Sequence, residues 1–361
     1  SIGALAMSGG ALGGGGGALT VTGASTWTAG AFTGAGTTTF SGNLAISGGT
    51  LRTLVDGHTL ANTGTVTWTN VNTGNRGLIQ SGSGAVIDNS GTWLDQTTFA
   101  IAIDNAYGGA TANFNNSGNY VKNGDSTTTI GIAFNNSGSV DVQNGWLALS
   151  GGGSHTGSFD VAAGATLNFA GGTHAVSGVV SGAGSGRMLV SSGNVNASGS
   201  NVFGGELEVS GGTLDVAGTF GTTAFTLSGG TRSGAGTLSS SNGTWTAGAF
   251  TGVGTTTFGG NLAISGGTLR TLVDGHTLAN TGTVTWTNVN TGNRGLIQSG
   301  SGAVINNSGT WLDQTTFAIG IDNAYGGATA NFNNAGSFVK TGASTTTIGI
   351  AFNNSGSVDV Q

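Results

Sequence analysis

The sequence contains no cysteine and no proline, and only 6% of its 361 residues are charged. The lack of cysteine excludes disulfide bonds. No run of 18 apolar residues occurs, so we expect no membrane span. Lys and Arg together number only 8, against 14 Asp and Glu, and they are scattered. Binding to a phosphate backbone requires clustered basic residues, so we also expect no nucleic-acid partner.

Charge is scarce but glycine is abundant, with 74 residues. Disordered chains are usually strongly charged and poor in large apolar residues. This chain instead has a mean hydropathy of +0.11 and carries 16 Phe and 7 Trp at regular spacings. Glycine and β-branched residues are poor helix formers, and no long stripe of 3.6-residue period is present. The composition therefore predicts a folded, all-β chain.

A short pattern built around an asparagine recurs along the chain. A large apolar residue stands two positions before the asparagine, a glycine two positions after it, and a β-forming residue four positions after it. Asn and Gly both tolerate positive φ, so the pattern predicts a tight turn between two strands. Successive asparagines are 27, 27 and 20 residues apart. Repetition at this step is the signature of a β-solenoid.

Stacking of such coils would bring like residues into columns, with neighbouring strands roughly 4.8 Å apart. Because strand side chains alternate between two faces, one set in each coil should point inward. The first predicted core column consists of Leu60, Ile87, Phe114 and Phe134, and the second consists of Val66, Trp93, Tyr120 and Val140. The predicted structural ladder of stacked amides consists of Asn62, Asn89, Asn116 and Asn136, and of Asn280, Asn307, Asn334 and Asn354.

The second set of asparagines belongs to a duplication. Residues 27–143 recur as residues 245–361 at an offset of 218, and 108 of the 117 positions are identical. Residues 144–244 lie between the copies and show short alternating strands, such as Glu206–Val209. Residues 1–26 resemble 219–244, with a two-residue difference in length. We predict one continuous β-solenoid of about 14 to 18 coils over residues 1–361, from coil lengths of about 20–27 residues.

Neither end of the sequence resembles the polar capping coil that a solenoid needs. We therefore expect an uncapped segment of a longer tandem array, or a subunit whose ends are covered by neighbours. In either case the expected partner is another copy of itself, arranged head to tail.

Candidate catalytic groups are few. Asp56-Gly57-His58 and its twin Asp274-Gly275-His276 look most like part of a catalytic triad, but a triad also needs a positioned nucleophile and an oxyanion hole. Aligned on the ladder, His58 falls where Ala85, Ala112 and Ile132 fall, which indicates a partly buried strand position. The sequence therefore predicts no catalytic residue at this point.

Paired carboxylates could cleave glycans, with Asp88 and Asp95, or Asp104, as candidates. Asp88 becomes Asn306 in the second copy, which argues against such a pair. Asp104-Asn105 alone supplies too few oxygen ligands for calcium. Hence we predict no metal, no cofactor and no enzyme. Ice binding is also disfavoured, because no regular array of threonines forms across successive coils.

Tryptophans could stack on sugars, although packing inside the coils explains them equally simply. The candidates are Trp27, Trp68, Trp93 and Trp146. We favour packing, and keep glycan binding as the alternative function.

A family resemblance is carried by Phe134–Leu149 followed by Ser150–Gly153. This stretch resembles repeats of giant secreted bacterial surface proteins, such as autotransporter passengers and filamentous-haemagglutinin-like adhesins. The likeness extends over nearly the whole chain. It implies a right-handed parallel β-helix, a location outside the cell or on the bacterial surface, and a role in adhesion or extracellular matrix. The expected function is thus a structural segment of an extracellular fibre or adhesin stalk, with surface glycans as a second class of partner.

Overall fold

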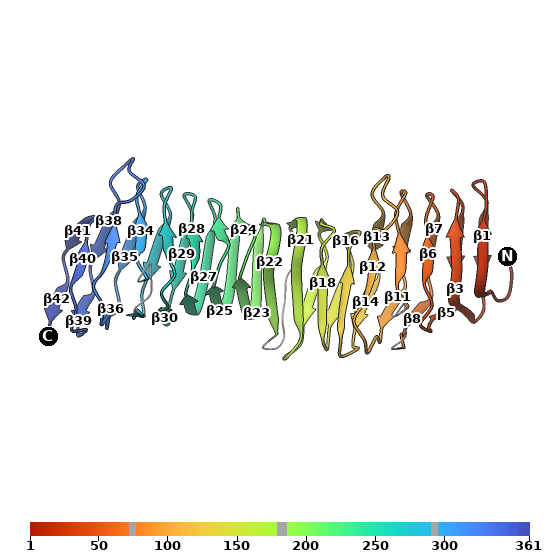
Figure 1. Cartoon of the computed structure of the whole chain (residues 1–361), viewed down its shortest axis with the longest axis horizontal. Helices are drawn as coiled ribbons and strands as arrows, with labels where there is room; N and C mark the ends of the chain where they lie inside the picture. The colour runs from red at the N-terminus through yellow and green to blue at the C-terminus, as the bar shows by residue number, and fades with distance from the viewer. Residues whose placement is uncertain (72–76, 179–185, 290–294) are drawn as a thin grey trace. The chain divides into compact units, whose positions relative to one another are not determined.

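The computed structural model describes residues 1–71, 77–178, 186–289 and 295–361. Within these residues every regular element is a β-strand, and strands of neighbouring turns pair in parallel. About 16 turns are stacked in this way (Figure 1). The predicted all-β fold, a parallel β-solenoid, is confirmed.

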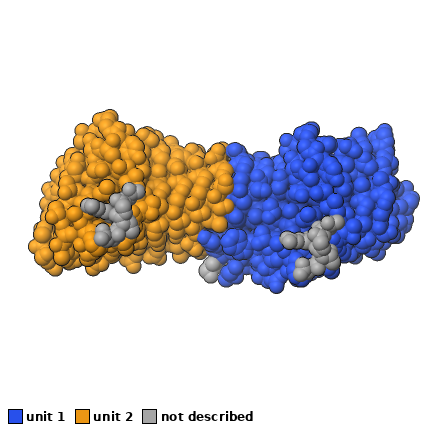
Figure 2. All heavy atoms as spheres, in the orientation of Figure 1, with its two compact units in different colours: residues 1–188 blue, residues 189–361 orange. Residues whose placement is uncertain are grey.

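The chain divides into two compact units, residues 1–188 and 189–361 (Figure 2). The boundary falls inside the segment between the two sequence copies, so unit 1 contains the first copy and unit 2 the second. Continuity of a single solenoid over residues 1–361 stays a prediction, and each unit is described by itself.

The strands of unit 1 are β1 (Ala6–Gly13), β2 (Ala18–Val21), β3 (Ser25–Thr33), β4 (Thr37–Phe40), β5 (Asn43–Ile46), β6 (Arg52–Leu54), β7 (Thr59–Asn62), β8 (Thr65–Trp68), β9 (Ile79–Ser81), β10 (Val86–Asn89), β11 (Thr92–Asp95), β12 (Ile101–Asp104), β13 (Asn113–Asn116), β14 (Asn119–Lys122), β15 (Thr127–Ile130), β16 (Ala133–Asn136), β17 (Ser139–Val142), β18 (Trp146–Leu149), β19 (Gly153–His155), β20 (Ser158–Val161) and β21 (Thr166–Val176).

Strand β22 (Arg187–Ala197) begins at the boundary. The strands that follow in unit 2 are β23 (Ser200–Val209), β24 (Thr213–Val216), β25 (Thr219–Leu227), β26 (Thr231–Ser233), β27 (Thr237–Trp245), β28 (Gly248–Phe250), β29 (Thr255–Phe258), β30 (Asn261–Ile264), β31 (Arg270–Leu272), β32 (Thr277–Asn280), β33 (Thr283–Trp286), β34 (Ile297–Ser299), β35 (Val304–Asn307), β36 (Thr310–Asp313), β37 (Ile319–Asp322), β38 (Asn331–Asn334), β39 (Ser337–Lys340), β40 (Thr346–Ile348), β41 (Ala351–Asn354) and β42 (Ser357–Val360).

Coils of the duplicated segment have three short strands each. A strand pairs with the strands three places before and after it, as β10 does with β7 and β13. The register places Leu60 beside Ile87 and Ile87 beside Phe114. Copy 2 repeats this arrangement, with β35 between β32 and β38. Like residues therefore stack directly, because the spacing of the sequence repeat equals the length of one coil.

Coils in the first part of unit 2 have only two strands each, and one of the two is long. Strand β25 pairs with β23 and β27, two places away. The sequence predicts a short strand at Glu206–Val209, whereas β23 spans Ser200–Val209. No Asn-x-Gly turn interrupts these strands, and the chain bends instead at a register shift between Phe203 and Glu206. The strand was longer than predicted because a bulge can redirect a strand without ending it.

The turn glycines serve a purpose other than the predicted one. None of the ladder asparagines or the glycines two residues later adopts a positive φ. A Cβ added to Gly91 would instead lie 2.1 Å from the carbonyl oxygen of Gly64, and one on Gly118 would lie 2.1 Å from that of Gly91. Glycine is required here because successive turns touch backbone to backbone.

The solenoid interior holds both predicted core columns. All eight side chains are at most 1% exposed. Trp93 packs edge-on against Phe114 with ring centroids 5.0 Å apart, and Phe114 packs against Phe134 at 5.2 Å. Aromatic pairs at such distances stabilise a core beyond the area that they bury.

Candidate functional site

The ladder asparagines end the strands that precede each turn, and their side chains point into the core. Asn62 Nδ2 donates to Asn89 Oδ1 at 2.6 Å, Asn89 Nδ2 to Asn116 Oδ1 at 2.7 Å, and Asn116 Nδ2 to Asn136 Oδ1 at 2.8 Å. Each of the four is at most 1% exposed. A buried amide without hydrogen bonds would be costly, and stacking identical amides supplies each with a partner.

The second copy has the same ladder. Asn280, Asn307 and Asn334 each donate from Nδ2 to the Oδ1 of the next asparagine at 2.7 Å, and the last acceptor is Asn354. In unit 1 the column is bordered by Phe40 before Asn62 and by His155 after Asn136. These amides therefore bond to one another inside each unit, which is a structural role, and among the described residues the first acceptor of the unit 1 ladder, Asn62 Oδ1, has no donor.

A buried polar cluster lies beside the second core column. Tyr120 Oη donates to Asp95 Oδ2 at 3.0 Å, and the hydroxyl of Thr97 donates to Asp95 Oδ1 at 2.7 Å. Lys122 points into the same region and donates to the carbonyl of Gly124. Asp95 and Lys122 are both fully buried. Burial lowers the pKa of Lys122, although the charges of Asp95 and Asp125 oppose this shift.

Buried arginines were not expected from the sequence. Arg52 is 0% exposed, and its Nε donates to the carbonyl of Trp27 at 2.9 Å and its Nη1 to that of Gly77 at 2.6 Å. Arg270 makes the same contacts in unit 2, with Trp245 and Gly295. Desolvation lowers the pKa of each to about 10, so both stay charged at neutral pH. Main-chain carbonyls thus hold guanidinium groups inside this solenoid.

The alternation of inward and outward side chains along each strand could have shown that these charged residues are buried. Lys122 stands two positions after Tyr120, and Asp95 two after Trp93, so alternation places both side chains inward. Arg52 likewise alternates with the buried Leu54. The sequence interpretation missed them because it noted only that the basic residues are scattered along the chain, and did not assign them to a strand face.

The Asp56-Gly57-His58 segment places its histidine in the core. His58 is 3% exposed and lies just before β7, so the predicted strand position is wrong. Its Nε2 is 3.1 Å from the buried Thr38 hydroxyl, and its Nδ1 is 3.3 Å from the carbonyl of Thr33. Asp56 instead accepts a bond from the Thr33 hydroxyl at 2.8 Å. The imidazole is thus held by the core, and neither of these two partners is a carboxylate.

The other histidines are also buried. His155 Nε2 lies 2.9 Å from His174 Nδ1, and both residues are 0% exposed. Desolvation, together with the neighbouring His174, lowers the pKa of His155 to about 3. Desolvation and the charge of Arg232 lower the pKa of His276 to about 3 as well. These side chains are neutral at physiological pH and unavailable to a substrate.

The carboxylates considered for glycan cleavage are separated by the strand faces. Asp95 is fully buried, whereas Asp88 lies on the outer side and accepts a bond from Asn115 at 2.8 Å. Desolvation raises the pKa of Asp104. Among the described residues, no three His, Cys, Asp or Glu side chains come close enough to hold a metal ion. In the same part of the chain, no helix is long and apolar enough to cross a membrane.

Three of the four candidate tryptophans are core residues. Trp27, Trp68 and Trp93 are 0% exposed, and the centroids of Trp68 and Trp93 are 6.1 Å apart. Trp146 is 39% exposed. Tyr107 and its twin Tyr325 are each 49% exposed. Stacking on a sugar is therefore open to Trp146 and these tyrosines, but not to the other three tryptophans.

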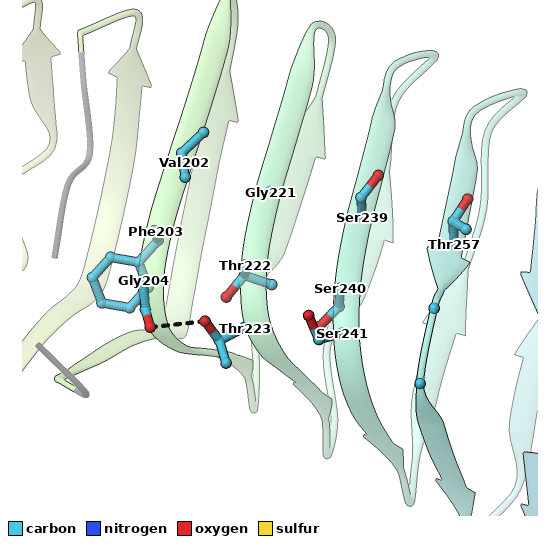
Figure 3. Close-up of a pocket in the computed structure, with 12 residues that line it drawn as sticks. Val202, Phe203, Gly204, Gly221, Thr222, Thr223, Ser239, Ser240, Ser241 and Thr257 are labelled. Atoms are coloured by element: carbon cyan, nitrogen blue, oxygen red, sulfur yellow. Dashed lines mark hydrogen bonds between the residues drawn. The ribbon is translucent and has the colours of Figure 1, made fainter. Parts of the chain in front are cut away.

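A groove of about 750 Å³ lies over the long strands β23, β25 and β27 and the start of the next coil (Figure 3). Two apolar residues, Val202 and Phe203, line one side of it. The rest of the lining consists of hydroxyl residues and glycines: Gly204, Gly221, Thr222, Thr223, Ser239, Ser240, Ser241, Thr257, Gly259 and Gly260. Thr223 Oγ1 donates to the carbonyl of Gly204 at 2.9 Å, which joins two coils along the groove. A Cβ on Gly221 would meet nothing closer than Val202 Cγ2 at 3.8 Å.

The groove exists because the strands there bend without a projecting turn. Gly243 packs closely against the next coil, since a Cβ at that position would lie 2.1 Å from the Phe258 ring. The groove contains hydroxyl and main-chain groups that can bind a polar ligand extended across several coils. It contains no histidine or carboxylate among its lining residues.

Comparison of the chain with protein-family models, with curated proteins and with solved structures found no match.

Proposed function

We propose that this chain is a structural segment of an extracellular bacterial fibre or adhesin stalk, which associates with itself through stacked β-coils. One observation carries the proposal. The 117-residue copies keep the same coil register, and 108 of their positions are identical. Repetition of whole coils lengthens a solenoid without changing its cross-section, as a stalk requires.

The interior supports the same role. Asparagine ladders, aromatic columns and buried charges all link one coil to the next. All four histidines are buried, so the residue type most used in acid–base catalysis is unavailable at the surface. These features suit a rod that bears load better than one that turns over a substrate.

Self-association can be tested with the 361-residue chain. Cryo-microscopy and fibre diffraction of concentrated protein should show elongated assemblies with a repeat of roughly 4.8 Å along the axis. Val360→Lys places a charge on a side chain that is 73% exposed in β42, whereas its twin Val142 is fully covered by the next coil. This variant should block assembly, and the outward-facing control Asp359→Lys should not. Dispersed monomers at every concentration would contradict the proposal.

Location is tested separately, by antibody labelling of intact cells that make the protein. Labelling only after the cells are opened would contradict an extracellular stalk.

Glycan binding is the second candidate, and the groove in unit 2 favours it. Gly221→Leu would fill the middle of the groove, and Thr213→Leu on β24 provides a control on another strand. If the groove binds glycans, a glycan array should retain signals with the control and lose them with Gly221→Leu. The absence of any signal with the unmodified chain would remove this candidate.

A further inference from the structure

Three asparagines in the sequence are followed directly by glycine. At such a step the main-chain nitrogen of the glycine can attack the side-chain amide carbon of the asparagine, because glycine has no side chain to obstruct the approach. The reaction requires a glycine nitrogen that is not held by the neighbouring coil and an asparagine that water can reach. The three steps are Asn123-Gly124, Asn144-Gly145 and Asn242-Gly243.

The solenoid holds two of these steps. The N–H of Gly124 donates to the carbonyl of Asp95 at 3.1 Å, and Gly124 is buried. Asn242-Gly243 lies inside β27, which pairs with β25 on one side and with β30 on the other. Pairing on both sides keeps that main chain extended. At both steps the glycine nitrogen should therefore react only after the coil opens locally.

Asn144-Gly145 lies in the turn between β17 and β18, in a different environment. Asn144 is exposed, and the N–H of Gly145 donates to Asn144 Oδ1 at 2.9 Å. In the described parts of the chain, this N–H makes no bond to a main-chain carbonyl. Because Cγ is bonded to Oδ1, the side chain is folded back with its reacting carbon beside the glycine nitrogen. Holding the two groups together removes much of the entropic cost of their reaction.

We propose that Asn144 is a site of spontaneous deamidation, and that this modification weakens the bonds between its turn and the neighbouring coils. The nitrogen of Gly145 bonds to Cγ of Asn144 and the bond from Cγ to Nδ2 breaks. The proton of the glycine nitrogen ends on the departing ammonia. Water then opens the resulting succinimide ring at either carbonyl carbon. One product is aspartate, and the other is isoaspartate, in which the main chain is one methylene longer.

The neighbouring coils leave no room for a longer turn. Gly145 has a φ of +66°, and a Cβ there would lie 2.4 Å from the carbonyl oxygen of Ser126. On one side of the turn, Trp146 donates its N–H to Ser126 at 3.2 Å. On the other side, Thr166 donates its N–H to the carbonyl of Gly145 at 3.0 Å. An added methylene shifts Gly145 and Trp146 relative to these fixed partners, so isoaspartate should weaken both bonds.

The test is to incubate the whole folded chain at mildly alkaline pH and to map its peptides by mass spectrometry over time. Asn144 should lose its amide at least about tenfold faster than Asn123 and Asn242, because an opening free energy of only about 1.4 kcal/mol slows a reaction tenfold. Incubation in water enriched in heavy oxygen should label residue 144. Equal rates at the three asparagines of the folded chain, or retention of the amide at Asn144, would overturn the proposal.

Denaturant provides the control for local sequence. In the unfolded chain the three steps should react at similar rates, since each is asparagine followed by glycine. A preference for Asn144 that persists unchanged in denaturant would show that the sequence and not the turn selects this residue, and would also overturn the proposal.

An unreactive variant tests the second part of the proposal. Asn144→Gln keeps an amide but would have to close a larger ring, so it should stay unmodified. During incubation, hydrogen exchange at the amides of Trp146 and Thr166 should become faster in the natural sequence and stay constant in Asn144→Gln. Unchanged exchange at both amides after isoaspartate has formed would overturn this part.

Discussion

The two 117-residue copies are a natural substitution experiment on one fold. Eight of their nine differences lie in turns or at strand positions that alternate with inward residues. Only one pair, Tyr120 and Phe338, is buried in both copies. The interior therefore tolerates less change than the surface, because each inward side chain contacts the coils above and below it.

Even the single buried difference keeps an aromatic ring and changes only a hydroxyl. In copy 1 that hydroxyl binds Asp95. In copy 2 the twin Asp313 accepts a bond from Thr346 Oγ1 at 2.5 Å, and Lys340 Nζ lies 3.5 Å from its Oδ1. A different donor thus replaces the missing one, which is what a buried carboxylate requires.

Lowering the pH should destabilise unit 1 more than unit 2, and this is the largest difference that we expect between the units. Unit 1 contains His58, His155 and His174, and unit 2 contains only His276, each with a lowered pKa. The unfolded chain binds these protons below about pH 6.5, where the folded chain resists them. The stability from neutral histidine is complete above that pH and is lost as the pH falls toward about 3. For His155 and His276, whose pKa falls to about 3, the cost should approach about 1.4 kcal/mol per pH unit in this window, and for His58 and His174 the effect has the same direction.

Hydrogen exchange measured between pH 7 and pH 4, corrected for intrinsic rates, should therefore show unit 1 opening first. Peptides that span one of the nine differences report on a single copy. The double variant His155→Phe/His174→Leu should reduce the difference between the two units in acid-induced hydrogen exchange. Equal acid sensitivity of both units in the unmodified chain would contradict the prediction.

Phe114→Ala should cost roughly 3–5 kcal/mol, because it opens a cavity in a packed column. Its ring contacts Trp93, Tyr120 and Phe134. The twin substitution Phe332→Ala should cost a similar amount in copy 2. Chemical denaturation measures both losses, and Thr92→Ala on the outer side of β11 is the control, expected well under 1 kcal/mol. A control as costly as Phe114→Ala would refute the inward–outward assignment.

Tyr120→Phe gives the buried cluster of copy 1 the aromatic residue that copy 2 has at this position, Phe338. Removing the hydroxyl takes one donor from the buried Asp95, so we expect a loss of about 1.5–3 kcal/mol in the free energy of unfolding. The reverse change, Phe338→Tyr, should raise the free energy of unfolding by less than Tyr120→Phe lowers it, because Asp313 already has Thr346 as a donor. Equal and opposite effects of the two substitutions would show that this compensation is absent.

Asp88→Asn should have the smallest effect. Asn115 donates to Asp88 at 2.8 Å, and Asn333 donates to Asn306, the natural asparagine in copy 2, at 2.9 Å. The same bond is available to either residue, so the free energy of unfolding should change by less than about 0.5 kcal/mol. A larger loss, seen by chemical denaturation, would mean that the carboxylate charge itself matters at this position.

Much of this structure could be predicted from the sequence alone, because inward and outward residues alternate along each strand and the same pattern recurs once per coil. The parallel β-solenoid, the core columns and the spacing of Asn62, Asn89, Asn116 and Asn136 follow from residues that recur once per coil. These features are predictable because neighbouring coils repeat the same local pattern, so one coil specifies how the next must stack.

Tertiary structure decided the features that depend on contacts between unlike coils. The bend in β23 and the main-chain carbonyls that surround the buried arginines belong to this class. Nothing in the local sequence around Arg52 shows which main-chain carbonyls receive its guanidinium group. The oxygens belong to Trp27 and Gly77, which are separated along the chain, and only the stacking of coils brings them to the same arginine.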